Sequence, residues 1–156
     1  MVKKPFIIMM LLIIIITSAY LLQEDWVLEV CMDGKTLYIP IRIGDHFNLT
    51  YKHSVYGDEV LQVFTIDEGL MILNDIISTV RVIEYSYPDQ NYELIRGLAR
   101  IKPLNVTAKK LQLIGYEKLE YKGRLISINE RPMKVVVIEI KRVTLFTIFI
   151  RTFSQY

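Results

Sequence analysis

Cysteine and histidine are scarce in this chain of 156 residues. Cys31 is the only cysteine, so no disulfide can form within the chain and no cluster of thiolates can bind a metal. We expect it to be a half-buried strand residue, although it could also bridge to a second copy. The only histidines, His46 and His53, are seven positions apart, which places them on opposite faces of an unbroken strand. The sequence therefore predicts no metal site and no cofactor.

Charge of one sign is also lacking. The formal net charge is +2, 23% of the residues are charged, and no five like charges follow one another. A chain this balanced has no electrostatic field that would favour nucleic acid as a partner. The sequence also contains no internal repeat, low-complexity tract or flexible linker, and its length suits one domain.

Hydrophobic residues, in contrast, make up 52% of the chain, and the N-terminus holds most of the excess. Residues 5–22 form an almost unbroken apolar run, preceded by two lysines and followed by two acidic residues. As a helix, a run of about 18 residues just crosses a hydrocarbon core about 30 Å thick. The lysines place the N-terminus in the cytoplasm. We therefore expect residues 1–25 to form a cytoplasmic N-terminus and transmembrane anchor in the cell membrane, with residues 26–156 outside.

A cleaved signal peptide is the alternative interpretation of this run. Thr17, Ser18 and Ala19 offer the small residues that a signal peptidase needs. The run, however, is longer than the usual signal core of about 7 to 15 residues, and it continues beyond Ala19. We therefore expect a retained single-pass anchor, and the rest of the protein is expected to be exported in both cases.

Two N-glycosylation patterns begin at Asn48 and Asn105. Two such matches arise easily by chance in a chain of this length. We therefore expect neither asparagine to be modified.

From residue 26 onward, apolar and polar residues mostly alternate, as is typical of β-strands. The alternation occupies residues 26–43, 46–55, 60–66, 69–75, 77–87, 109–121, 124–128 and 134–153. Asp33-Gly34 and Lys122-Gly123 are typical of hairpin turns. Residues 91–106 are ambiguous between helix and strand, because Gly97 breaks a helical spacing. The sequence thus predicts a mainly β fold, an antiparallel β-sandwich or small barrel behind a single transmembrane helix.

Near the C-terminus, residues 143–150 form an apolar stretch between Arg142 and Arg151. Eight residues are too few for a spanning helix and about right for a strand that is buried on both faces. We expect the inner strand of a sandwich here, and a docking strand for a membrane partner is the alternative.

The hairpin around His53 contains the candidate binding residues. On a strand over residues 46–55, alternation places Tyr51 and His53 on the apolar face and Ser54 on the other face. His53 therefore cannot readily act as general base for Ser54. A Gly-x-Ser-x-Gly pattern is also absent, and no pair of carboxylates stands out, so we expect no enzymatic activity and no catalytic residue.

Across this hairpin, Gln62 is the polar member of an otherwise apolar face and could meet His53 directly. Such a pair beside Tyr51 would form a polar spot at a ligand pocket or a partner interface. The alternative is a core histidine with one satisfied hydrogen bond. We interpret Tyr51, His53, Ser54 and Gln62 as the candidate binding or interface residues.

The same hairpin contains a run of spaced aromatic, apolar and polar residues, Phe47-x-Leu49-x-Tyr51-x-His53-Ser54-Val55, then Phe64, Ile66 and residues 67–73. Over residues 46–75 the sequence resembles a family known as domain of unknown function 1850. Its members are exported or membrane-anchored, and many are encoded beside, or fused to, the permease of TAXI-type tripartite ATP-independent periplasmic (TRAP) transporters. Gln62 stands where the family has an acidic residue, and the later glycine-rich segment is missing.

The resemblance implies a role beside a solute transporter. We expect a non-enzymatic accessory subunit or binding module, with the membrane and a multi-spanning permease as partners. The alternative is a stand-alone cell-surface domain that binds a ligand or has a structural role.

Overall fold

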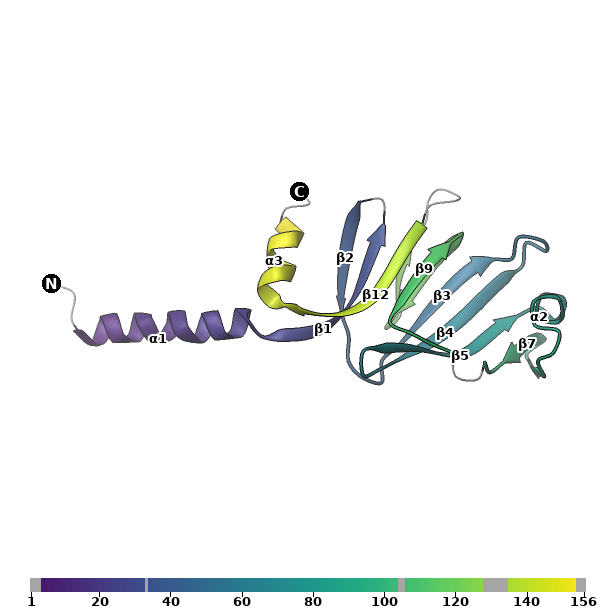
Figure 1. The fold of residues 1–156 in the computed structure, drawn as a ribbon, viewed down its shortest axis with the longest axis horizontal. Coiled ribbons are helices and arrows are strands. Elements are labelled where there is room, and N and C mark those ends of the chain that lie inside the picture. Colours follow the sequence, from purple (N-terminus) through teal and green to yellow (C-terminus); the bar gives the residue numbers. More distant parts are fainter. Residues whose placement is uncertain (1–3, 33, 104–105, 128–134, 154–156) are drawn as a thin grey trace.

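The computed structural model describes residues 4–32, 34–103, 106–127 and 135–153, which form mainly antiparallel β-sheet (Figure 1). In chain order the elements are α1 (Lys4–Leu21), β1 (Glu24–Met32), β2 (Lys35–Pro40), β3 (His46–Lys52), β4 (Glu59–Asp67), β5 (Leu70–Ser78), α2 (Val80–Ser86), β6 (Glu93–Ile95), β7 (Leu98–Ile101), β8 (Thr107–Ala108), β9 (Lys110–Ile114), β10 (Tyr116–Tyr121), β11 (Arg124–Ser127), β12 (Val135–Thr144) and α3 (Leu145–Phe153). The predicted mainly β fold class is therefore confirmed.

Two sheets make up the β domain. The smaller has the strand order β2-β1-β12-β9, and the larger has the order β11-β10-β3-β4-β5-β7-β6, with β8 paired to β5. The first and last strands are neighbours, and Glu24 at the start of β1 lies opposite Thr144 at the end of β12. Between β9 and β10 the chain passes from the smaller sheet to the larger one at Gly115, whose φ of +78° favours glycine.

One hydrophobic core joins the two sheets. Leu28 and Ile138 contribute to it from the smaller sheet, and Phe47 and Leu49 from the larger sheet; all four are at most 1% exposed. The rings of Phe47 and Phe64 stack across β3 and β4 with centroids 4.9 Å apart. Each such side chain contributes about 1.5–3 kcal/mol through removal from water. The predicted inward face of β3 is thus confirmed at its first two apolar positions.

Turn chemistry explains the hairpins. Lys122 and Gly123 both have positive φ, 50° and 74°, as a type I′ turn between β10 and β11 requires. Gly34 has a φ of +78° in the β1–β2 hairpin, while Asp33 lies outside the described residues. Arg96 and Gly97 have φ values of 51° and 83°, so the ambiguous segment 91–106 contains a short hairpin of β6 and β7.

The strand expected over residues 77–87 is wrong beyond Ser78, because α2 begins at Val80. The helix buries Val82 and Ile83 side by side, at 1% and 0% exposure, whereas a strand would have turned one of them outward.

The strand expected over residues 143–150 is also wrong, because β12 ends at Thr144 and α3 follows. Strand pairing stops there because Thr144 lies opposite Glu24, the first residue of β1. The hydroxyl of Thr144 accepts a hydrogen bond from the backbone N–H of Thr147 at 3.2 Å, the bond of a helix N-cap.

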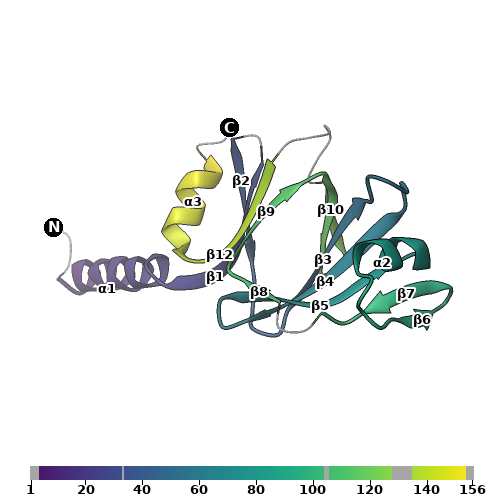
Figure 2. The same cartoon turned by 45° about the vertical axis from the view of Figure 1, so that its right-hand side comes forward.

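The N-terminal run forms α1, which projects from one end of the β domain (Figures 1 and 2). Its apolar side chains are exposed along residues 6–16. The transmembrane helix expected over residues 5–22 is not confirmed, because no helix in the part of the chain that the structure describes combines the length and the apolar character needed to cross a membrane.

Candidate functional site

A polar hollow of about 440 Å³ lies where β3 ends, beside α2 and the corner between β9 and β10. We call it the tyrosine–histidine hollow. It is lined by Tyr51, Lys52, His53, Ser54, Ser86, Tyr87, Ile114 and Gly115. Three of the four residues that the sequence selected, Tyr51, His53 and Ser54, therefore line one hollow.

His53 is a turn residue, which corrects its expected place on the strand. β3 ends at Lys52, and the backbone N–H of His53 donates to the carbonyl of Asp58 at 2.8 Å. The backbone N–H of Gly57 donates in turn to the carbonyl of His53 at 2.7 Å. These bonds close a tight turn that leaves the imidazole half-buried at the edge of the hollow rather than in the core.

The imidazole binds Ser86, a residue of α2 that the sequence gave no reason to select. Nε2 of His53 lies 3.1 Å from Oγ of Ser86. Nδ1 accepts a long hydrogen bond from the backbone N–H of Val55 at 3.4 Å, which favours the tautomer with its proton on Nε2, the form that donates to Ser86. A general base needs the reverse, a free lone pair on Nε2 facing the serine hydroxyl. The geometry therefore positions Ser86 without activating it.

Two tyrosines, Tyr51 and Tyr87, line the hollow, and Tyr116 packs against Tyr51; we call these three side chains the tyrosine wall. The rings of Tyr51 and Tyr116 pack with centroids 4.7 Å apart, and the hydroxyl groups of Tyr51 and Tyr87 are hydrogen-bonded. Burial, together with the neighbouring Tyr87, raises the pKa of Tyr51 to about 12. Burial likewise raises the pKa of Tyr87 and of Tyr116. The wall therefore presents neutral phenol groups over the whole physiological pH range.

Gln62 does not meet His53, and the predicted direct pair is wrong. In the β3–β4 register Gln62 lies opposite Leu49, and its Oε1 accepts a hydrogen bond from the hydroxyl of Tyr116 at 2.6 Å. His53 lies beyond the last paired residue of β3, Lys52, so the two side chains belong to different levels of the sheet. Gln62 thus supports the tyrosine wall from behind rather than lining the hollow.

An ion pair holds α2 against the turn that contains His53. Arg81 of α2 binds both carboxylate oxygens of Asp58, at 2.7 and 2.6 Å, and the hydroxyl of Thr79 donates to the same carboxylate at 2.6 Å. The bonds from Arg81 and Thr79, with the nearby positive charge, lower the pKa of Asp58 to about 2. The Arg81 guanidinium also lies over the ring of Tyr56, 5.2 Å from its centroid.

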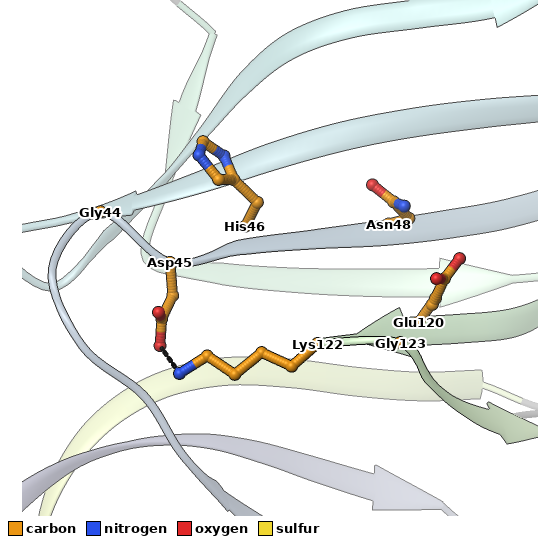
Figure 3. A pocket seen from close by; sticks show the side chains of 7 residues that line it. All are labelled: Gly44, Asp45, His46, Asn48, Glu120, Lys122 and Gly123. Carbon is orange, nitrogen blue, oxygen red and sulfur yellow. Dashed lines mark ion pairs between the residues drawn. The ribbon is translucent and has the colours of Figure 1, made fainter.

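A second hollow, of about 350 Å³, lies at the opposite end of β3 (Figure 3). Its Asp45 carboxylate is paired with the Lys122 ammonium at 2.9 Å, and His46 is hydrogen-bonded through Nδ1 to Thr65 at 2.8 Å. The Asp45 and Lys122 charges are therefore paired with each other. Among the described residues, no three potential metal ligands lie close enough together to hold an ion.

The remaining sequence predictions concern Asn48, on the larger sheet, and Cys31, on the smaller sheet. Asn48 is half-buried on β3, between β4 and β10, where it lines the second hollow. Asn105 lies outside the described residues. Cys31 is half-buried on β1, as expected, with its sulfur 3.6 Å from the hydroxyl oxygen of Thr36.

Comparison with known proteins adds no relative. The chain matches no family model, and it has no significant match among curated proteins or solved structures. The resemblance of residues 46–75 to domain of unknown function 1850 thus remains a prediction.

Proposed function

We propose that this protein is a non-enzymatic binding module attached to the cell membrane by α1, with its β domain outside the cell. The observation that carries the proposal is the exposure of α1: every residue from 6 to 16 is apolar, with 48–66% of its surface exposed. Contiguous apolar surface of this extent is rare on soluble monomers and marks a contact with lipid or a partner. The lysines before the helix and the acidic residues after it favour the outside for the β domain.

The tyrosine–histidine hollow is the proposed binding site. Its two phenol groups, those of Tyr51 and Tyr87, are neutral and hydrogen-bonded to each other, which leaves one hydroxyl proton to donate to a ligand. Lys52 adds a positive charge at the rim, where it also lies 4.0 Å from Glu117. These groups favour a ligand or a partner side chain rich in hydrogen-bond acceptors, such as a carboxylate. The proton on Nε2 of His53 supports binding rather than general-base catalysis.

We further propose that the module serves a TRAP/TAXI-type transporter as an accessory subunit. The support is the resemblance, because its central residues Tyr51, His53 and Ser54 all line the hollow. The alternative, a stand-alone cell-surface domain, is favoured by one observation. The hollow lies at the end of the β domain away from α1 (Figure 1), where a ligand arrives more easily than a membrane protein.

A pull-down from native membranes in mild detergent tests these proposals. The tagged wild type is compared with His53→Ala, and with His46→Ala as a matched control in the other hollow. Recovery of a multi-spanning permease with wild type and His46→Ala, and its loss with a folded His53→Ala, would establish an accessory subunit that binds through the hollow. A permease recovered with all three proteins would keep the subunit role and exclude the hollow as its interface.

The absence of any permease would favour the stand-alone domain. Attachment itself is tested separately by extraction of the membranes with alkaline carbonate. We expect the protein to stay in the membrane pellet, and its release into the supernatant would contradict attachment through α1.

A further inference from the structure

The C-terminal helix α3 is half-buried at Leu145, Thr147 and Ile148 and exposes further apolar residues on another side. Toward the protein, the guanidinium of Arg151 lies 3.6 Å from the carboxylate of Glu29 and donates to the hydroxyl of Tyr38. On the other side, Phe146 and Phe149 are 48% and 59% exposed, and Ile150 is 47% exposed. These three residues follow the i, i+3, i+4 spacing that places side chains on one helix face.

A helix on a globular domain normally turns its apolar face toward the core, whereas α3 also leaves an apolar face exposed. Here the smaller sheet contacts α3 through a carboxylate, that of Glu29 on β1. Glu29 is only 5% exposed and also pairs with Lys141, so the carboxylate is fixed in place. The ion pair to Arg151 thus connects α3 to the smaller sheet.

The position of α3 relative to α1 indicates what covers the apolar face. The backbone N–H of Leu145 donates to the carbonyl of Gln23 at 3.3 Å, so α3 begins beside the residue where α1 has just ended. In both views α3 lies on the α1 side of the smaller sheet and runs across the axis of α1 (Figures 1 and 2). If α1 enters a membrane, α3 lies along the surface of that membrane.

Aromatic and basic side chains also occur where α1 joins the β domain, beside the start of α3. Tyr20, near the end of α1, is 63% exposed. Trp26, at the start of the β domain, is partly buried against the core, and the guanidinium of Arg142 lies 4.7 Å from its ring centroid. Tyrosine and tryptophan are enriched at the interface between lipid and water, and basic side chains reach from there to the headgroups.

We propose that α3 is a second membrane contact, an interfacial helix whose apolar face, formed by Phe146, Phe149 and Ile150, enters the lipid. Short amphipathic helices bind membranes in this way, with the helix axis in the plane of the interface. The proposal rests on the proposed membrane attachment through α1. Its consequence is a β domain held in one orientation by two contacts, with the tyrosine–histidine hollow directed away from the lipid.

The test uses the full chain in vesicles of phosphatidylcholine and phosphatidylglycerol in equal amounts, which contain no other protein. Cys31→Ser provides a background without thiols. Single labelling sites are then introduced as Phe149→Cys in α3, Ile14→Cys in α1, and Val55→Cys as the control. Val55 matches Phe149 in its exposure of 59% but lies in the turn at the hollow. Each thiol receives a bimane fluorophore, and nitroxide lipids report contact with the bilayer.

We expect nitroxides near the headgroups to quench the Phe149→Cys label several-fold more than the Val55→Cys label, and deep nitroxides to quench the Ile14→Cys label. Equal, weak quenching at Phe149→Cys and Val55→Cys, with Ile14→Cys strongly quenched, would overturn the role of α3 and leave the anchor intact. Weak quenching at Ile14→Cys would instead contradict the membrane attachment and, with it, this inference.

Discussion

The hydrogen bond between Tyr116 and Gln62 gives a quantitative test of how the tyrosine wall is built. Tyr116→Phe removes the hydroxyl that donates to Oε1 of Gln62 at 2.6 Å, at a half-buried position. A net hydrogen bond stabilises a protein by about 1 kcal/mol, and an acceptor left unsatisfied costs about 1–3 kcal/mol. Because Gln62 retains some contact with water, we expect a loss of about 1–2 kcal/mol in the free energy of unfolding.

A double-mutant cycle separates this bond from general effects of packing. Gln62→Met keeps the volume of the side chain and removes its acceptor. Once it is in place, Tyr116→Phe should cost little more, which gives a coupling energy of about 1 kcal/mol. The matched cycle of Gln62→Met with His53→Ala should be additive to within about 0.5 kcal/mol, because His53 binds Ser86 and not Gln62.

Urea unfolding of the full chain in detergent micelles, followed by the fluorescence of its single tryptophan, measures all these variants. Equal slopes of free energy against urea concentration would show that the unfolded states are comparable. Additivity in the Tyr116–Gln62 cycle, or a coupling of about 1 kcal/mol in the His53–Gln62 cycle, would refute the arrangement described above.

Three further predictions use the same unfolding measurement. Because the pKa of Asp58 is lowered, its ion pair stabilises the folded state above about pH 4 and loses this effect as the pH falls toward 2. Asp58→Asn should therefore flatten the pH dependence of the free energy of unfolding between these two pH values. An unchanged dependence there would contradict the prediction. Gly69→Ala should cost at least about 1 kcal/mol more than Gly123→Ala, because both have positive φ but only at Gly69 would a Cβ lie 2.7 Å from the Trp26 ring; equal losses would exclude this contact. Leu119→Ala, at a fully buried position, should cost about 2–5 kcal/mol, and a loss below about 1 kcal/mol would show that the two sheets do not share a packed core there.

The sequence predicts those parts of the fold that depend on neighbouring residues. The hairpins at Gly34 and at Lys122-Gly123 form because local turn geometry decides them. The last element depends on more than neighbouring residues. The apolar stretch of residues 143–150 suits a buried strand or a helix equally well. It forms α3 because β1 begins at Glu24, opposite Thr144, and offers β12 no further residue to pair with. Where the pairing of β1 with β12 ends depends on the tertiary structure, and the local sequence pattern does not contain this information.

The candidate site divides in the same way. Tyr51, His53 and Ser54 are adjacent in the chain, and the sequence selected them together. Ser86 and Tyr87 come from the far end of α2, and the sequence contains no local signal that this helix meets the turn after β3. The sequence does not identify the partner of Gln62, because alternation defines which face of a strand a residue occupies but not which residue of the neighbouring strand lies opposite it.

The pairing of the first strand with the last has a consequence for biogenesis. β12 is an interior strand of the smaller sheet, between β1 and β9, and the start of β1 at Glu24 pairs with its end at Thr144. At a synthesis rate of about 5–20 residues per second, β1 waits on the order of ten seconds for its partner. During this interval the smaller sheet is open along the side of β1 that β12 will cover. If the protein is exported as proposed, the chain is still incompletely folded when translocation begins, and the smaller sheet closes only after β12 has been made.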